Sequence, residues 1–166
     1  MTIIREIKEE DAENFLALCR QLDEENKFMM LEPGERKTSL AEQEQRIREI
    51  LATDNQVIFV AEEHGSLAGY VAANGGRFAR NQHEAYIVIG ILEALTSRGI
   101  GTALFEHLEE WARSHGVHRL ELTVMVHNRR GVGLYQKMGF AIEGTKKDSL
   151  RVDGSYVDEY YMAKLL

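Results

Sequence analysis

The stretch from Tyr86 to Ala112 constrains the fold most strongly, because three kinds of local pattern follow one another without a break. Residues 86–92 form an apolar run of the length and composition of a buried strand. Gly99 and Gly101 follow it in a short loop. From Leu104 onward, apolar residues recur at helical spacing and glutamates occupy the opposite face. This order predicts a strand, a glycine-containing turn and an amphipathic helix.

The loop Arg98-Gly99-Ile100-Gly101-Thr102-Ala103 is a candidate anion-binding site. Its two glycines let a ligand come close to the backbone, because they carry no Cβ atom. The N–H groups that open a helix have no acceptor within the helix, and the helix dipole favours an anion there. We therefore expect a phosphate group to bind between Arg98 and Ala103.

Three alternatives compete for this loop when it is considered alone. A Walker loop requires a lysine directly after its last glycine, and Thr102 stands at that position. A dinucleotide fingerprint requires a third glycine where this chain has Leu104, and Glu121, about twenty residues on, alternates with apolar residues of the next predicted strand. An ordinary glycine turn into a core helix is the third alternative.

A second stretch favours a different interpretation. The segment from His127 to Phe140, HNRRGVGLYQKMGF, resembles the second signature of the Gcn5-related N-acetyltransferase (GNAT) superfamily, in which an asparagine precedes Leu-Tyr-x-Lys-x-Gly-Phe. The glycine loop is similar to the acetyl-CoA pyrophosphate loop of that superfamily, except that Thr96 occupies the usual glutamine or arginine position. Glu93 and Leu95 replace the proline and aromatic residue often found before the loop.

The resemblance implies a single N-acetyltransferase domain over residues 1–166 with a mixed α/β fold. Six to seven strands would form a twisted sheet flanked by helices and splayed between the fourth and fifth strands. Acetyl-CoA would lie in the gap, with its pyrophosphate on the N–H groups from Arg98 to Ala103. The further residues implied at the cofactor are Ile89 and Ile91 at the end of the central strand, Asn128, Arg130 and Tyr135.

Tyr135 matches the superfamily tyrosine proposed as the general acid for the coenzyme A thiolate. Its unperturbed pKa of ~10 lies slightly above the ~8.5 of a thiol, which suits proton transfer in that direction. The alternative is a core aromatic residue on a short helix. The general base is less well marked: Glu84 ranks first, followed by His83 and Glu93, and each of them is equally compatible with surface charge.

The acceptor substrate is expected to be a primary amine, such as a protein N-terminus, a polyamine or another small amine. The C-terminal segment from Tyr156 to Leu165 and the Ile142-Glu143-Gly144 step look like bacterial ribosomal-protein N-terminal acetyltransferases and their small-molecule relatives. In the superfamily, the two N-terminal helices and their connector shape the acceptor side. This nominates Phe28, Met29 and Met30 as substrate-facing, although they could equally pack the helix pair. A non-catalytic acyl-CoA-binding or sensor domain is the alternative function.

Composition limits the range of partners. Residues 1–55 carry eight basic and fourteen acidic side chains, which makes a nucleic-acid surface unlikely and suits a cationic substrate. Cys19 is the only cysteine and lies among apolar residues, so it is expected to be a small buried residue and not a nucleophile. The absence of a long apolar run or a signal peptide predicts a cytoplasmic protein without a membrane span. No metal site is predicted, and a homodimer that shares the edge of the strand 156–165 is possible.

The remaining elements follow from local patterns. Asp11 is the expected N-cap of a first helix and Thr38 or Ser39 that of a second one. The segment from Asp148 to Ser155 reads as a polar connector. The predicted strands cover residues 2–7, 56–63, 67–73, 84–92, 119–126, 140–146 and 156–165, and the predicted helices cover 11–25, 39–51, 102–115 and 128–138.

Overall fold

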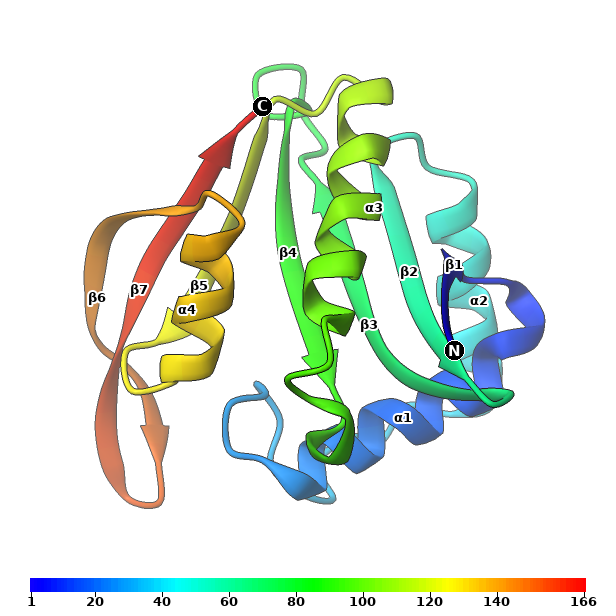
Figure 1. Cartoon of the computed structure of the whole chain (residues 1–166), viewed down its shortest axis with the longest axis horizontal. Helices are drawn as coiled ribbons and strands as arrows, with labels where there is room; N and C mark the ends of the chain where they lie inside the picture. The colour runs from blue at the N-terminus through cyan, green and yellow to red at the C-terminus, as the bar shows by residue number, and fades with distance from the viewer.

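The computed structural model describes all 166 residues, which form one seven-stranded sheet with helices on both faces (Figure 1). The strand order is β1-β2-β3-β4-β5-β7-β6, and every neighbouring pair is antiparallel except β4–β5. The elements are β1 (Thr2–Glu6), α1 (Ala12–Glu25), α2 (Leu40–Leu51), β2 (Gln56–Glu63), β3 (Ser66–Gly75), β4 (Glu84–Ile91), α3 (Ile100–Ser114), β5 (Arg119–Met125), α4 (Arg129–Lys137), β6 (Ala141–Val152) and β7 (Ser155–Leu165).

The central feature of the sheet is a gap between β4 and β5. These parallel strands pair only from Glu84 to Tyr86, opposite Arg119 to Glu121, and then diverge. The Tyr86 hydroxyl and Thr123 Oγ1 lie 2.7 Å apart and link the two strands where the divergence begins. In Figure 1 the two halves of the sheet open downward like a V from this closed end. The prediction of a mixed α/β sheet splayed between its fourth and fifth strands is confirmed.

Two apolar clusters hold the helices against the sheet. One cluster joins α1 and α2 to β2 and β3, with Phe15 packed edge-on against Tyr70 at 5.0 Å between ring centroids. The other cluster joins α3 and α4 to the opposite face, where Leu104 and Leu108 of the amphipathic helix are fully buried. Cys19 lies in the first cluster, and burial raises the pKa of its thiol to about 11, as expected for a structural cysteine.

Of the two predicted N-cap residues, one caps its helix with its side chain and the other does not. Ser39 caps α2, because its side chain accepts a hydrogen bond from the Glu42 backbone N–H at 3.1 Å. Asp11 occupies the N-cap position of α1, but its side chain makes no capping bond to that helix. Its carboxylate instead accepts two hydrogen bonds from Arg5, both at 2.8 Å, and one from the Lys8 backbone. The expected cap is therefore a buried ion pair that joins β1 to α1.

The predicted connector between the last two strands was wrong. Residues 148–152 continue β6, and Asp153 and Gly154 form the turn into β7 with φ values of 51° and 81°. Positive φ at both central residues and an Asp-Gly sequence are typical of a type I′ hairpin turn. This long hairpin also corrects the expected dimer edge. Strand β7 is paired on both sides, by β5 and β6, so the free edge belongs to β6.

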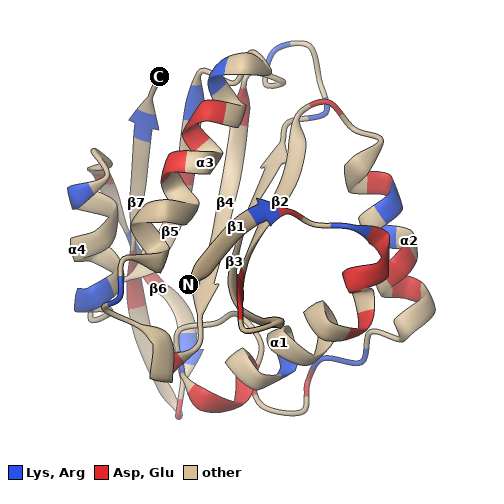
Figure 2. Ribbon diagram, turned by 45° about the vertical axis from the view of Figure 1, so that its right-hand side comes forward, with Lys and Arg blue, Asp and Glu red and all other residues tan.

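Charge is distributed unevenly over the helices (Figure 2). Acidic residues are frequent on α1 and α2, whereas α4 carries Arg129, Arg130 and Lys137 and no acidic residue. The basic helix borders the gap, so an anionic ligand there would meet favourable charge in an otherwise acidic protein. None of the helices combines the length and the apolar character that a membrane crossing requires.

Candidate active site

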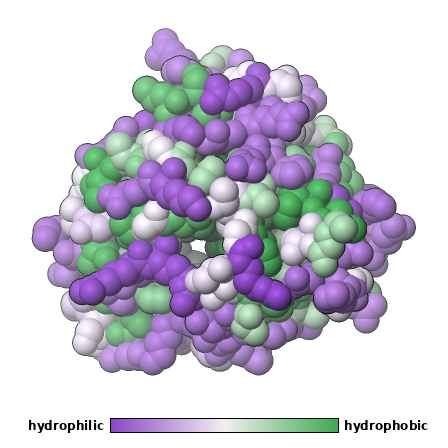
Figure 3. Space-filling model, in the orientation of Figure 1, coloured by the Kyte–Doolittle hydropathy of each residue, from purple (hydrophilic) through white to green (hydrophobic).

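A cavity of about 600 Å³ occupies the gap between the two halves of the sheet. The hollow near the centre of the face in Figure 3 lies where Figure 1 shows the opening between β4 and α4. Its walls come from the diverging ends of β4 and β5, from the start of α4, from the segment after α1, and from the hairpin β6–β7. The sheet supplies these walls because β4 and β5 stop pairing after Tyr86.

The loop that directly follows Thr96, a residue of the cavity wall, leaves its backbone donors unpaired. None of the backbone N–H groups from Ser97 to Thr102 has an acceptor within the chain. Ser97 and Gly99 adopt left-handed conformations, with φ values of 61° and 81°, and consecutive N–H groups in such turns form anion-binding concavities. Lys137 of α4 adds a cation, with its Nζ atom 3.3 Å from Thr102 Oγ1. Sequence reasoning missed Lys137, although it is the lysine of the Leu-Tyr-x-Lys segment.

Two side chains of this loop, Arg98 and Ile100, do not face the cavity, although the resemblance implied that both residues lie at the cofactor. Arg98 points to Glu63 on β2, with 3.2 Å between their nearest charged atoms, and does not line the cavity. Ile100 is buried in the core under α3, and the Ala103 N–H bonds to the Gly99 carbonyl. The backbone from Ser97 to Thr102, and not the Arg98 side chain, is therefore what the loop offers to a phosphate.

Close packing between helices also explains why residue 101 is a glycine, and the sequence alone did not show this. A Cβ atom at this position would lie 2.8 Å from Leu134 Cδ2 and 3.2 Å from Ile91 Cδ1. The glycine thus lets α3 pack closely against α4 and the end of β4. A bulky side chain at Gly101 would therefore displace Leu134 and disturb the packing of the fold.

The end of β4 directs backbone donors into the gap. The Leu92 N–H bonds to the Ala68 carbonyl on β3, and the Glu84 carbonyl accepts from Gly76 on the same side. Because backbone groups of a strand alternate in direction, the N–H groups of the odd-numbered residues Ile89 and Ile91 face the gap. Strand β5 does not pair with them there. The two N–H groups are therefore free to donate to an acceptor in the gap, at the two strand positions that the resemblance implied at the cofactor.

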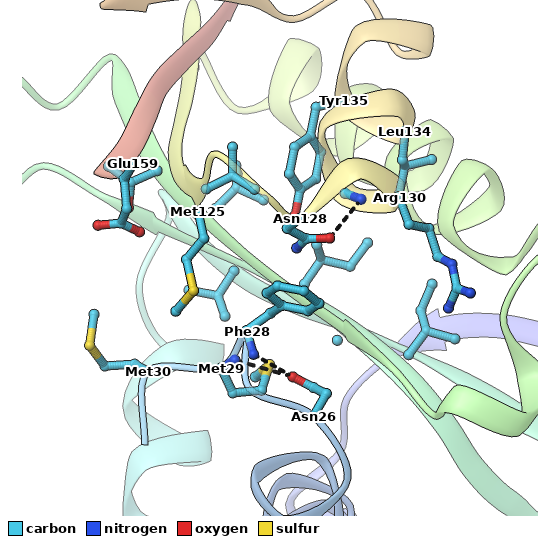
Figure 4. Close-up of a pocket in the computed structure, with 18 of the residues that line it drawn as sticks. Asn26, Phe28, Met29, Met30, Met125, Asn128, Arg130, Leu134, Tyr135 and Glu159 are labelled. Carbon is cyan, nitrogen blue, oxygen red and sulfur yellow. Dashed lines mark hydrogen bonds between the residues drawn. The ribbon is translucent and has the colours of Figure 1, made fainter. Parts of the chain in front are cut away.

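Tyr135 extends from α4 into the same cavity (Figure 4). Its ring packs against the rings of Phe105 and Phe140, with 5.8 Å and 6.2 Å between the ring centroids, so core contacts fix its position. Its hydroxyl has no partner in the protein, and every fully buried polar side-chain atom has one, so the hydroxyl must be open to the cavity. Burial raises the pKa of Tyr135 well above its usual range, and Tyr86 adds to this shift. The hydroxyl is therefore protonated at neutral pH.

The first turn of α4 places two further predicted residues at the cavity. Asn128 caps the helix, because its side-chain oxygen accepts from the Gly131 backbone N–H at 3.0 Å, and it lines the cavity as well. Arg130 also lines the cavity, but its guanidinium is paired with Glu93 at 3.2 Å and donates to Thr96 Oγ1 at 3.0 Å. Glu93, which was a candidate base, is thus held by an arginine.

The segment after α1 closes the cavity from below in the view of Figure 4. The Asn26 side chain accepts hydrogen bonds from the Phe28 and Met29 backbone N–H groups at 2.9 and 3.2 Å, which fixes their turn. Phe28 packs against His127 with 5.3 Å between ring centroids, and Met30 is largely exposed. All three predicted acceptor-side residues, Phe28, Met29 and Met30, line the cavity.

Glu84, the carboxylate that ranked first as the base, does not line the cavity. It begins β4 and pairs in register with Arg119, at the end where the sheet is closed. His83 precedes it, and its carbonyl accepts hydrogen bonds from His118 and Arg119. The structure thus does not bring Glu84 or His83 together with Tyr135.

The cavity contains a different carboxylate, Glu159 of β7, which sequence reasoning missed. Glu159 is only 6% exposed, lines the cavity, and accepts a hydrogen bond from the Ser149 hydroxyl at 2.5 Å. Asp158 and Glu159 form an acidic pair directly before the apolar and aromatic run from Tyr160 to Ala163, and this pair is the only signal for the site in the sequence. The predicted connector from Asp148 to Ser155 left Ser149 outside the strands, so no partner for Glu159 was evident from the sequence.

A splayed mixed sheet with strand-end donors and an open tyrosine hydroxyl at its gap, and with unpaired N–H groups at the start of the adjoining helix, is an arrangement suited to an acylated, phosphate-bearing carrier. Residues 16–140 match the Acetyltransferase (GNAT) family, and the chain therefore belongs to that family. This confirms the superfamily resemblance that the glycine loop and the Asn128–Phe140 segment carried.

Curated relatives and solved structures agree with this assignment. The chain is 36% identical over 105 residues to L-amino acid N-acetyltransferase AaaT of Escherichia coli, a match that spans 61% of this chain and 63% of that protein. It is 31% identical over 118 residues to the N-alpha-acetyltransferase RimI of Mycobacterium tuberculosis, with 70% of each chain covered. A GNAT-family acetyltransferase from Streptococcus pneumoniae superimposes with a TM-score of 0.97 at 32% identity over the whole of both chains.

A more distant structure shares the fold. The putative acetyltransferase yncA of Salmonella typhimurium, solved with its cofactor acetyl-CoA, shares the fold with a TM-score of 0.88 at 17% identity, covering 99% of this chain and 94% of that one. The expected likeness to ribosomal-protein N-terminal and small-amine acetyltransferases is also confirmed by the relatives, which include enzymes of both kinds by name.

Proposed function

We propose that this protein is an acetyl-CoA-dependent N-acetyltransferase that acetylates a primary amine. The observation that carries the proposal is a set of donors in and beside one gap. The N–H groups at the end of β4 and the Tyr135 hydroxyl lie at the gap, and the unpaired N–H groups from Ser97 to Thr102 follow directly after Thr96, which lines it. An acetyl thioester on a pyrophosphate-bearing carrier needs this set. The family membership and the acetyl-CoA complex of a protein with the same fold support it.

Each group would have a distinct role. The backbone from Ser97 to Thr102 and the nearby Lys137 would bind the pyrophosphate, since anions are stabilised at such helix starts. The Ile91 N–H, or its neighbour two residues earlier, would donate to the thioester carbonyl oxygen and stabilise the negative charge that develops there, a contribution of ~3 kcal/mol. Tyr135 would give its proton to the departing thiolate. Acetyl-CoA supplies the activated acetyl group.

The acceptor would reach the carbonyl from the opposite side of the gap. Residues of the 26–30 loop and of the hairpin β6–β7 line that side, whereas α4 and the residues Glu93 and Thr96, which precede α3, line the cofactor side. A non-catalytic acyl-CoA sensor is the alternative function. Such a sensor needs the anion site but has no use for a tyrosine hydroxyl open to the cavity, so the placement of Tyr135 favours catalysis.

Two measurements on one preparation test the proposal. Coenzyme A should raise the melting temperature, and nicotinamide dinucleotides should not, because ligands stabilise in proportion to their binding. With acetyl-CoA and a panel of primary amines, release of free thiol should require an amine. Stabilisation by coenzyme A without turnover on any amine would support the sensor, and stabilisation by the dinucleotide alone would reject both functions.

We further propose a homodimer that uses the free edge of β6. The strand is twelve residues long and most of it is exposed, and Ile142, Tyr156 and Tyr161 are exposed apolar or aromatic residues on the same hairpin. An open strand edge of this length commonly pairs or is protected. Light scattering at micromolar concentration should give twice the chain mass, and a monomer under those conditions would end the proposal.

A further inference from the structure

Glu159 is unusual among the buried carboxylates of this protein. Three acidic residues are buried: Asp11, Asp23 and Glu159. Asp11 is paired with Arg5 at 2.8 Å and Asp23 with Arg36 at 2.7 Å. Glu159 has no Lys, Arg or His within ion-pair distance, and its one partner is the uncharged Ser149 hydroxyl. Burying an unpaired carboxylate is costly, so its retention within a cavity points to a ligand that supplies the missing positive charge.

The second carboxylate oxygen of Glu159 is the one available to a ligand. Oε1 accepts from Ser149, and Oε2 has no partner in the protein. Since no fully buried side-chain oxygen lacks a hydrogen bond, Oε2 must be open to the cavity that Glu159 lines. Figure 4 shows the Glu159 side chain extending from β7, with the Met125 and Met30 side chains beside it in the view.

The cavity wall around this carboxylate is apolar, and the exposed Lys146, its register partner on β6, forms no ion pair with it. The acceptor side of the cavity is lined by Phe28, Met29, Met30, Met125 and Leu150, and Glu159 is the charged residue among them. The cations that line the cavity, Arg129 and Arg130, both lie in the first turn of α4, and Arg130 is already paired with Glu93. Lys27 is also occupied, by Asp153 at 2.5 Å.

We propose that Glu159, held by Ser149, binds the amino group of the acceptor, and that the acceptor is a primary amine with an apolar body and no carboxylate beside the nitrogen. This rests on the proposed acetyl transfer and names its substrate class. The carboxylate of a free amino acid lies two bonds from its nitrogen, so an amino acid bound at Glu159 would place a second negative charge beside Glu159 or among the thioethers. The N-terminus of a peptide and a simple apolar amine both avoid this conflict.

The proton balance fits this arrangement. A bound ammonium carries three protons, and the amide product keeps one. Glu159 takes the first proton, and the nitrogen then attacks the carbonyl carbon, so a C–N bond forms and the C–S bond breaks. Tyr135 protonates the departing sulfur and is reprotonated with the second proton lost by the nitrogen. The proton on Glu159 leaves to solvent, so the products are the amide, the free thiol and one proton.

Phenethylamine and phenylalanine test the substrate class, because they differ only in the carboxylate. Phenethylamine is the stronger base, so a preference for it cannot come from easier deprotonation. We expect kcat/KM for phenethylamine to exceed that for phenylalanine by about 10²-fold or more, the scale of leaving a buried charge unpaired. A tripeptide amide with an N-terminal phenylalanine distinguishes the two sources: activity on it indicates a protein N-terminus, and its absence indicates a small amine.

Glu159→Gln tests the residue. It keeps the shape and the Ser149 contact while removing the charge, so kcat/KM for phenethylamine should fall about 10²-fold and the preference over phenylalanine should shrink to about 10-fold or less. Glu106→Gln, an exposed glutamate on α3 without an ion pair, is the matched control and should behave as wild type. Coenzyme A should stabilise all three proteins equally.

The outcomes separate this inference from the proposed function. If wild type releases no thiol with any amine, the proposed function fails. If wild type is active but uses phenylalanine as well as phenethylamine, or if Glu159→Gln keeps full activity on phenethylamine, the inference is overturned and the acetyl transfer stands. Should Glu159→Gln fold poorly, Ser149→Ala and the wild-type substrate ratio still decide, because neither depends on that variant.

Discussion

Replacing Tyr135 with phenylalanine removes one hydroxyl and leaves the packing of the ring in place. The ring contacts with Phe105 and Phe140 do not involve the oxygen. The hydroxyl makes no hydrogen bond within the protein, so no partner is left unsatisfied in the variant. The free energy of unfolding should therefore change by less than ~1 kcal/mol, the net contribution of a typical hydrogen bond. Coenzyme A affinity should also change little.

Turnover should respond quite differently. If Tyr135 protonates the thiolate, kcat should fall by about 10²-fold or more, the scale of losing a general acid, which corresponds to ~2.7 kcal/mol in the barrier. Burial raises the pKa of Tyr135, which by itself makes it a weaker acid. The same apolar surroundings disfavour a free thiolate beside it and so make the thiolate a stronger base. Both the pKa of the tyrosine and the pKa of the thiol are raised, so the difference between them changes less than either value and the proton transfer remains feasible.

The assay combines three measurements on each protein. Thiol release at saturating acetyl-CoA and amine gives kcat, thermal unfolding gives stability, and titration with coenzyme A gives affinity. A large loss of kcat with unchanged stability and affinity is the expected result. Full activity of Tyr135→Phe would refute the reasoning and return the residue to a purely structural role. Because the pKa of Tyr135 is raised, wild type should also show no decline of kcat from its ionisation below about pH 10.

Three further predictions follow from the packing and the charges. Gly101→Val should lower the free energy of unfolding by ~1–3 kcal/mol because the new side chain displaces Leu134, and thermal unfolding should show a lower melting temperature. Loss of coenzyme A binding with an unchanged melting temperature would instead indicate that the glycine faces only the ligand. Burial raises the pKa values of Tyr70 and Tyr135, so stability should be full below about pH 10 and should fall above it by up to ~1.4 kcal/mol per pH unit for each tyrosine; denaturant titrations from pH 8 to 11 measure the slope, and a flat profile would contradict the burial. Glu84→Gln should keep kcat within about 2-fold of wild type, because Glu84 lies outside the cavity, and a 10²-fold loss would restore it as the base.

Local patterns in the sequence were sufficient for the glycine loop and for every helix and strand except the second half of β6 and its turn into β7. The periods of apolar residues, Ser39 and the glycine-containing turn before Leu104 each reflect interactions between residues a few positions apart, and these form in nearly the same way whatever surrounds them. The motif from Asn128 to Phe140 then gave the family, and with it the gap and the position of Tyr135.

Side-chain partners far apart in the sequence were decided by the tertiary structure. Arg98 pairs with Glu63 thirty-five residues away, and Asp11 pairs with Arg5 and does not cap its helix. Leaving a charged group without a partner costs free energy where it is shielded from water, so each of these charges takes the partner that the fold brings near it. Glu159 reaches the cavity only because the Asp153-Gly154 turn brings Ser149 onto the facing strand and the sheet opens beyond Tyr86. Local sequence patterns were therefore enough for the helices, for most of the strands and for the glycine-containing loop before α3. The register of the hairpin and the divergence of β4 from β5 determined which carboxylate shares the cavity with Tyr135, since both depend on packing across the whole sheet.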